Sequence, residues 1–296
     1  MKKETTVYID SKSHASEMFR TLRTNIQFMN SNKNLKTLLV TSTLPEEGKS
    51  WISANLAIAF AQTGKKVLLV DADMRKGRQF NIFGVSPIPG LSNYLSGVIE
   101  GRESNELNLD SFIQKAEIEN LYIMPAGNVP PNPSELLVSE RMLNLINELK
   151  ESFDITIFDG TPSLILADAP ILSRIVDSTI IVTAYNETKM DNIEKVKKSI
   201  EGIGGNISGV VINKVPLSSK RYENLYYGST YQIKEEGKDK NKKENKINIK
   251  EKFKTKIEKK QKQPSQKQVT DVQDILDQIQ SYLDEEKKKL KNGDNK

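Results

Sequence analysis

Cysteine is absent from this chain of 296 residues, and histidine occurs once, at position 14. Without cysteine the chain can form no disulfide, no thiolate-bound zinc site and no thiol nucleophile. A single histidine also excludes a metal centre built from several imidazoles. The lack of cysteine fits a protein of the reducing cytoplasm, which is the location that we expect.

Long apolar runs are missing as well. The longest ones, KVLLV at 66–70 and TIIV at 179–182, have the length of a β-strand. They are far shorter than the roughly 20 residues that a membrane-spanning helix needs. The first residues include two lysines but no apolar segment after them, so the sequence predicts no signal peptide. We therefore expect a soluble protein.

Positive charge is unevenly distributed. Residues 234–267 contain 14 lysines and 6 acidic residues, whereas residues 268–296 contain 5 lysines and 7 acidic residues. Residues 1–233 are left with a net charge of −1, although the whole chain carries +5. The high isoelectric point thus belongs to the C-terminal part and says nothing about the ligand of the folded domain, and we expect no nucleic-acid partner.

Apolar strand-like runs alternate with helical patterns over most of the chain. This order is typical of an α/β domain in which helices cover both faces of a mostly parallel sheet. The expected strands lie at 36–42, 65–73, 120–126, 154–160, 178–185 and 206–215, and the clearest helices at 15–30, 51–62 and 134–150.

Changes in composition divide the chain into five parts. Polar, lysine-rich sequence from residue 234 onward is typical of disorder, and apolar residues at 269–283 repeat for only about two heptads, too few for a coiled coil. The predicted parts are an N-terminal helix (1–34), a nucleotide-binding domain (35–216), a tyrosine cluster (217–232), a basic low-complexity linker (233–268) and a short amphipathic helix (269–291).

A phosphate-binding loop is predicted between the first strand and the following helix, in the sequence TSTLPEEGKSW at 41–51. Gly48 would end the loop, Lys49 would reach the β- and γ-phosphates, and Ser50 would bind Mg²⁺. The first glycine of the usual pattern is replaced by Thr43. The alternative is an ordinary helix N-terminus capped by Ser50, but the position between a buried strand and an apolar helix favours a P-loop.

Acidic residues follow two of the predicted strands. Asp71 and Asp73 end the run VLLVDAD, Arg75 comes next, and Asp159 ends the run TIFD. Ligands of a parallel sheet gather at the carboxyl ends of its strands, so these carboxylates and the P-loop would share one edge. Crowded carboxylates repel one another unless a cation separates them. Mg²⁺ with ATP meets that need better than the alternative, in which each aspartate only caps a helix.

These motifs together resemble the bacterial tyrosine kinases of the CpsD/CapB type, whose fold is that of MinD/ParA-like P-loop NTPases. Thr43 and Pro45 in the loop, the DxDxR sequence at 71–75 and the DxxP sequence at 159–162 correspond to the family's Walker A, A′ and B motifs. The sequence PPNPSELL at 130–137 also resembles a stretch of the family. The resemblance covers about residues 5–231.

Two further regions resemble functional segments of that family. The helix EMFRTLRTNI at 17–26 is similar to its ExxRxxR subunit-contact motif, through Glu17, Arg20 and Arg23. The sequence RYENLYYGSTYQ at 221–232 lies where the family carries autophosphorylation sites, and it contains Tyr222, Tyr226, Tyr227 and Tyr231. The alternative for this cluster is an aromatic interface patch.

The resemblance implies the activity and a role for each site residue. The chain would transfer phosphate from ATP to its own tyrosines, in trans within a ring, and also to other proteins. A separate transmembrane modulator would recruit it to the inner face of the membrane, where it would regulate capsule or exopolysaccharide synthesis or export. The expected catalytic residues are Lys49, Asp71 (the base), Asp73 and Asp159; the metal shell is Ser50, Asp73 and Asp159; the nucleotide contacts are Thr43, Pro45, Glu47, Gly48, Lys49, Ser50, Trp51, Arg75 and Asn213.

The loop departs from the family pattern at two positions. Glu46 stands where the family usually has glycine, and Trp51 replaces the last hydroxyl residue. Glu46 is expected to strain the loop or to place negative charge near the phosphates, which would weaken ATP binding.

Two other functions remain open from the sequence. One is a ParA/MinD-like positioning ATPase, but that class carries a lysine four residues before the last loop glycine, where this chain has Leu44. The other is a non-catalytic nucleotide-dependent switch of a polysaccharide machine.

Overall fold

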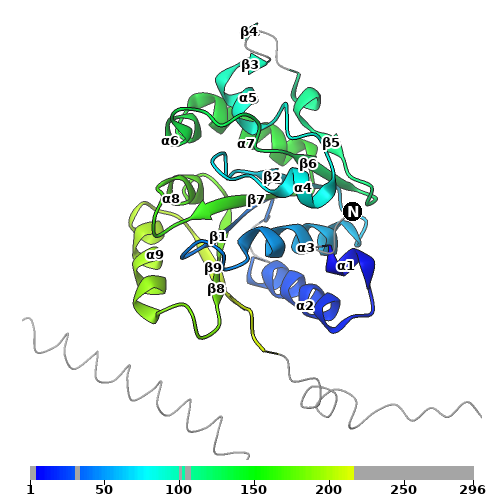
Figure 1. Cartoon of the computed structure of the whole chain (residues 1–296), viewed down its shortest axis with the longest axis vertical. Coiled ribbons are helices and arrows are strands. Elements are labelled where there is room, and N and C mark those ends of the chain that lie inside the picture. Colours follow the sequence, from blue (N-terminus) through cyan, green and yellow to red (C-terminus); the bar gives the residue numbers. More distant parts are fainter. Residues whose placement is uncertain (1–4, 31–33, 100–101, 104–107, 217–296) are drawn as a thin grey trace, which may run out of the picture. The chain divides into compact units, whose positions relative to one another are not determined.

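The computed structural model describes residues 5–30, 34–99, 102–103 and 108–216 (Figure 1). The tyrosine cluster, the basic linker and the predicted C-terminal helix lie outside the described residues. Within the described part, no helix combines the length and apolar character that crossing a membrane requires.

A seven-stranded sheet forms the centre of the domain. Its strand order is β5-β6-β2-β7-β1-β8-β9, and all neighbouring pairs are parallel except β5 with β6. A separate two-stranded antiparallel ribbon joins β3 and β4. The strands are β1 (Thr37–Ser42), β2 (Val67–Asp71), β3 (Val98–Ile99), β4 (Arg102–Glu103), β5 (Gln114–Lys115), β6 (Leu121–Met124), β7 (Ile155–Pro162), β8 (Ser178–Ala184) and β9 (Ile207–Asn213).

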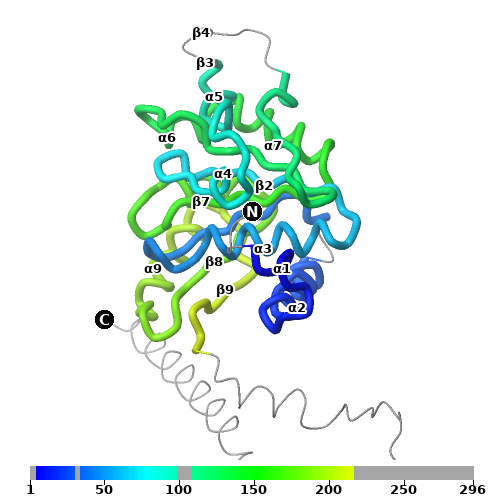
Figure 2. The backbone as a smooth tube through the Cα atoms, turned by 45° about the vertical axis from the view of Figure 1, so that its right-hand side comes forward, coloured from blue at the N-terminus to red at the C-terminus, as the bar shows by residue number. Residues whose placement is uncertain are grey.

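Helices cover both faces of this sheet, as predicted (Figure 2). Side chains of a strand alternate between the faces, so Leu38 and Val40 pack in one apolar cluster while Leu39 packs in the other. The first face carries α1 (Thr6–Ile9), α2 (His14–Met29), α3 (Lys49–Ala61) and α4 (Gln79–Phe83). The second carries α5 (Leu91–Ser96), the 3₁₀ helix η1 (Leu109–Phe112), α6 (Pro133–Leu137), α7 (Glu140–Ser152), α8 (Asp168–Ser173) and α9 (Met190–Gly202).

One helix expected from the sequence is in fact two. The predicted helix 134–150 is interrupted at Ser139, whose extended backbone and hydroxyl cap the start of α7 by accepting a hydrogen bond from the Met142 N–H at 3.2 Å. A serine inside an apolar helical pattern offers the backbone this alternative partner. The six strands of the predicted set are all present, with ends shifted by a few residues.

Strand register places the predicted acidic residues at one edge. Asp71, at the end of β2, pairs in register with Asp159 of the neighbouring β7. Strand β1 lies on the other side of β7 and leads directly into the P-loop. The carboxyl ends of the three central strands therefore converge where the sequence predicts the site.

Candidate active site

The loop between β1 and α3 is shaped by a glycine that no other residue can replace without rearrangement. Gly48 has a φ of 96°, in the left-handed region that favours glycine. A Cβ atom added there would lie 2.1 Å from Nδ2 of Asn213, at the end of β9. That amide donates a hydrogen bond to the Glu47 carbonyl at 2.9 Å, so the last strand supports the loop directly.

A buried carboxylate holds the loop from inside. Glu47 accepts hydrogen bonds from the Thr43 hydroxyl at 2.6 Å and 2.8 Å, from the Leu44 N–H at 2.9 Å and from the Thr188 hydroxyl. Thr43, Glu47 and Asn213 were expected to contact the nucleotide, and this stays a prediction. In the structure their side chains bond to the loop, and Glu47 bonds to Thr188 as well, so they help to fix the shape of the loop. None of them lines the cavity described below.

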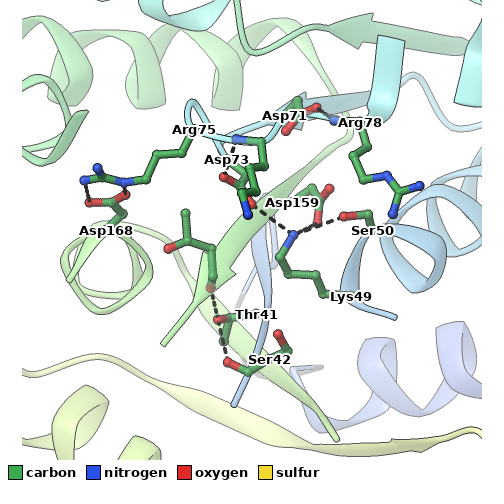
Figure 3. Close-up of polar contacts among 12 residues, drawn as sticks. Thr41, Ser42, Lys49, Ser50, Asp71, Asp73, Arg75, Arg78, Asp159 and Asp168 are labelled. Atoms are coloured by element: carbon green, nitrogen blue, oxygen red, sulfur yellow. Dashed lines mark hydrogen bonds and ion pairs between the residues drawn. The ribbon is translucent and has the colours of Figure 1, made fainter. Parts of the chain in front are cut away.

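Lys49 lies at the centre of the predicted acidic residues (Figure 3). Its Nζ is 3.2 Å from Oδ2 of Asp73 and 4.0 Å from Oδ1 of Asp159, and it donates a hydrogen bond to the Ser50 hydroxyl at 3.1 Å. Burial lowers the pKa of Lys49, but Asp159, Asp73 and Asp71 raise it by more, so the net pKa lies above its ordinary value. The ammonium group is therefore charged at neutral pH.

Asp71 is fully buried at the end of β2. Burial, followed by the nearby charge of Asp159, raises its pKa to about 7. Its Oδ2 accepts hydrogen bonds from the N–H groups of Arg78 at 2.7 Å and Gln79 at 2.9 Å, and its Oδ1 has no partner among the described residues. A carboxyl group with this pKa exchanges its proton near neutral pH, as a catalytic base must.

A cavity of about 500 Å³ opens beside these groups. Lys49, Ser50 and Asp73 line it together with the charged side chains of Glu46, Arg75, Lys76 and Arg78, whereas Asp71 and Asp159 are not among its lining residues. Its apolar lining includes Ile165, with 59% of its surface exposed. The complete lining is Pro45, Glu46, Gly48, Lys49, Ser50, Trp51, Asp73, Arg75, Lys76, Arg78, Ile82, Pro162, Ile165 and Leu166.

Arg75 lines this cavity but is held by a partner outside it (Figure 3). Its Nε lies 2.9 Å from Oδ2 of Asp168 on α8, and its Nη2 lies 3.3 Å from Oδ1 of the same side chain. The Ser134 hydroxyl also donates to Asp168. The hydrogen bond with Asp168 raises the pKa of Arg75, so the guanidinium group stays protonated.

Two residues that the sequence analysis missed contact Asp159. Ser53 donates to its Oδ1 at 3.2 Å, and Gln79 donates to its Oδ2 at 2.7 Å. Ser53 lies one helical turn after Lys49, so helix spacing was a usable signal. The sequence around Gln79 contains no motif that predicts a site residue. Gln79 lies at the site because of the conformation of the loop that follows β2.

The two departures from the family pattern have different structural outcomes. Glu46 has a φ of 65°, so a non-glycine residue occupies a left-handed conformation and the expected strain is confirmed. Trp51 packs its ring edge-to-face with Phe19 of α2, with centroids 5.1 Å apart, and joins α2 to α3.

The predicted subunit-contact residues make contacts within the chain. Glu17 and Arg20 form an ion pair, and Arg20 also donates to the Ser11 carbonyl at 2.6 Å. Arg23 donates to the Ala59 carbonyl of α3 at 2.8 Å. The four tyrosines predicted as phosphorylation sites lie outside the described residues.

The oxygen atoms at the site fit a divalent cation bound together with phosphates. In the described part of the chain, no group of three or more His, Cys, Asp or Glu side chains is arranged to hold a metal unaided. Three clustered carboxylates nevertheless face one ammonium group, and Asp71 keeps an oxygen without a partner. Hydroxyl and carboxylate oxygens at Ser50, Asp73 and Asp159 are of the type that Mg²⁺ prefers, with phosphates and water completing its shell.

Comparisons with known proteins agree with this geometry. A family model described as an AAA domain matches residues 46–209. The tyrosine-protein kinase YwqD of Bacillus subtilis is 35% identical over 229 residues, which are 77% of this chain and 93% of that protein. The tyrosine-protein kinase CpsD of Streptococcus agalactiae is 37% identical over 219 residues, which are 72% of this chain and 90% of that protein. The solved structure of the chimerical protein CapA2B2 has 35% identity and a TM-score of 0.67, covering 73% of this chain and 92% of that one.

Proposed function

The chain belongs to the bacterial tyrosine-protein kinases, and we propose that it transfers the γ-phosphoryl group of Mg-ATP to tyrosines of its own segment 217–232. The observation that carries this proposal is the position of Lys49, on a P-loop and between Asp73 and Asp159 at the edge of an open cavity. Kinase relatives and a P-loop domain imply ATP together with a divalent metal; Mg²⁺ is our proposal for that metal.

In the transfer, the phenol oxygen forms a bond to the γ-phosphorus while the bond to the β–γ bridging oxygen breaks, and ADP leaves. The transition state is loose, so positioning and charge neutralisation supply most of the catalysis. Lys49 and the N–H groups of the P-loop hold the β- and γ-phosphates. Ser50, Asp73 and Asp159 would hold the metal, which would supply further charge neutralisation on the phosphates.

The phenolic proton needs an acceptor, because the pKa of a tyrosine hydroxyl is near 10. We assign this role to Asp71, whose pKa of about 7 matches the task. Asp73 lines the cavity, whereas Asp71 is fully buried and does not line it. Asparagine substitutions at Asp71 and at Asp73 distinguish the two roles. Loss of the base removes the acidic limb of the pH–rate profile. Loss of a metal ligand raises the metal concentration that the reaction requires.

The apolar wall formed by Pro162, Ile165 and Leu166 offers a surface for the substrate ring. Arg75 would release its hydrogen bonds to Asp168 and donate to phosphate oxygens instead. The remaining nucleotide contacts that we propose are Pro45, Gly48 and Trp51 on the P-loop side, with Thr43, Glu47 and Asn213 acting through loop shape.

We further propose that the enzyme acts in a ring of identical subunits, assembled through Glu17, Arg20 and Arg23, and phosphorylates tyrosines of its neighbour. Each phosphotyrosine adds about −1.5 to −2 charges, so several of them would weaken the ring by repulsion. A separate transmembrane modulator would bring the kinase to the inner membrane face, where it regulates capsule or exopolysaccharide production. The names of relatives such as CpsD and CapA2B2 support this setting.

The deciding experiment is incubation of the pure full-length chain with Mg-ATP, followed by detection of phosphotyrosine and ADP. Phosphotyrosine is expected. ADP without phosphotyrosine would instead identify a ParA/MinD-like ATPase, and neither product would identify a non-catalytic switch.

Lys49→Met is expected to lower phosphotyrosine formation at least roughly a hundredfold, because it removes the charge that stabilises the transferred group. Mixing this variant, carrying a size tag, with active enzyme tests the direction of transfer. We expect label on the tagged, inactive chain. If only the active chain is labelled, transfer occurs in cis and the in-trans proposal is wrong.

A further inference from the structure

Gln79 connects three separate parts of the site, although nothing in the sequence pointed to it. It is the first residue of α4, fully buried, and follows the loop that leaves β2. Its side-chain amide donates to Oδ2 of Asp159 at 2.7 Å and to the Ser50 carbonyl at 3.0 Å. Its backbone N–H donates to Oδ2 of Asp71 at 2.9 Å. One residue thus touches β7, the start of α3 and the end of β2.

The chemistry of these contacts requires an amide. Both side-chain partners are acceptors, so the NH₂ group must face them, and this fixes the orientation of the amide. A glutamate would bring another carboxylate against Asp159, and an apolar residue would leave the Ser50 carbonyl and the Asp159 carboxylate without this donor. Glutamine is the side chain of this length that supplies two donors without adding charge.

The remaining amide oxygen makes the arrangement unusual. Oε1 of Gln79 is buried and accepts no hydrogen bond within the described residues. A side chain whose only role is to stabilise the fold would be expected to satisfy this group, because a buried acceptor without a partner is costly. The unpaired oxygen instead leaves Gln79 able to accept a hydrogen bond from water at the site.

We propose that Gln79 is a positioning residue for metal-bound nucleotide: it sets the distance and orientation of Asp159 relative to Ser50. The inference rests on the proposed function, since Ser50 and Asp159 are two of the groups assigned there to the metal. Ser53 supports Oδ1 of Asp159 from the other side at 3.2 Å, so the carboxylate is fixed by donors on both oxygens. Groups that orient metal ligands in this way commonly change metal affinity 10–100-fold when they are removed.

The test is a metal titration of the full-length chain with a fluorescent ADP analogue, carried out for wild type, Gln79→Met and Gln79→Glu. Nucleotide affinity is also measured in EDTA, and thermal unfolding confirms that each variant is folded. We expect about tenfold more Mg²⁺ to be required by Gln79→Met and more still by Gln79→Glu, where two carboxylates repel. Affinity in EDTA should change less than twofold.

Gln114→Met is the matched control. Gln114 of β5 also makes two amide hydrogen bonds, with the Ser86 N–H and carbonyl at 2.9 Å each, but at the edge of the sheet. It should bind Mg²⁺ and nucleotide like wild type.

Three results would overturn the inference. If both Gln79 variants require the same Mg²⁺ concentration as wild type, Gln79 does not position the metal ligands. If affinity in EDTA falls as much as affinity with Mg²⁺, its role is in the fold alone. If wild type itself shows no Mg²⁺-dependent binding of the nucleotide, the proposed function fails first, and the inference falls with it.

Discussion

At the scale of single residues, the P-loop contains a conformational cost that can be removed. Glu46 is exposed, lines the cavity and has a φ of 65°. A left-handed conformation costs a non-glycine residue about 1–2 kcal/mol, part of which glycine loses again through the greater freedom of its unfolded chain. We expect Glu46→Gly to raise the free energy of unfolding by about 0.5–1 kcal/mol, measured by urea denaturation.

Glu46→Gln separates strain from charge, because it keeps the side-chain size and removes the carboxylate. A charge at the edge of a phosphate site in water contributes on the order of 1 kcal/mol, so both variants should bind ATP roughly 3–5-fold more tightly. Stability should rise only for the glycine variant. Equal ATP affinity in Glu46→Gln and wild type would show that the carboxylate does not face the phosphates.

Motifs in the sequence were sufficient to predict which side chains meet at the site, whereas side chains that only the fold brings together were missed. Lys49, Ser50, Asp73 and Asp159 meet at one edge because each follows a strand or begins a helix of a recognisable pattern. Gln79 could not be predicted, since its contacts depend on a loop conformation. The hydrogen bond between the side chains of Thr43 and Glu47 inside the loop was not predicted either, and their contact with the ligand stays a prediction.

At the scale of elements, Asp177 joins three of them just before β8. Its Oδ2 accepts the N–H groups of Lys36 at 2.9 Å and Thr37 at 2.8 Å, where β1 begins, and its Oδ1 contacts Nζ of Lys150 on α7 at 2.6 Å. Burial alone would raise the pKa of Asp177, but Lys150 and these two N–H groups together hold it below its ordinary value.

The sign of the pH dependence follows from that lowered pKa. Asp177 contributes stability that is fully present above the unfolded-state value near 3.8 and is lost as pH falls through the lower folded-state pKa. Asp177→Asn should cost about 1–2 kcal/mol of unfolding free energy at pH 7. The difference from wild type should shrink below about pH 4.

Asp154→Asn is the control for this prediction. Asp154 also accepts an N–H group at the start of a strand, that of Lys66 at 2.8 Å, but within the described residues it accepts this one alone and forms no ion pair with a lysine. Urea denaturation across pH 3–8 compares the two variants. A constant loss in Asp177→Asn down to the lowest pH would mean that the ionised carboxyl is not the stabilising form.

Most elements could be predicted because their apolar patterns are long and bounded by loops. The six predicted strands occur, and the helices at 15–30 and 51–62 correspond to α2 and α3. The break at Ser139 and the short helices α4 and α5 could not be predicted, because elements of five or six residues carry too little periodicity. Packing against the sheet, rather than local pattern, determines them.

At the scale of the whole molecule, the proposed ring can be tested while the ion pair on α2 is kept, although the bond from Arg20 to the Ser11 carbonyl is lost. Glu17 and Arg20 form an internal ion pair on α2, so the double exchange Glu17→Arg with Arg20→Glu keeps that pair while reversing the charges offered to another copy. Wrongly paired charges at an interface cost several kcal/mol. We expect a smaller particle by light scattering and more than about tenfold less label on the Lys49→Met chain in mixtures.

The matched control is the double exchange Lys197→Glu with Glu201→Lys, an exposed ion pair on α9 at 3.9 Å. It should leave particle mass and cross-labelling unchanged. Arg23→Ala is a poorer probe, because loss of its bond to the Ala59 carbonyl loosens α2 from α3. Unchanged mass and labelling in the α2 exchange would show that subunits meet elsewhere.

The support that Asn213 gives to the P-loop has a mechanical consequence. Strand β9 ends with this residue, and three residues later the described chain stops, six positions before the first candidate substrate tyrosine. A pulling force on the chain that follows β9 would act on Asn213 before it acted on the rest of the sheet. Under the proposed function, the loop that would hold the nucleotide is thus linked through Asn213 to the segment that would carry the phosphate acceptors, so tension applied to that segment would reach the nucleotide site.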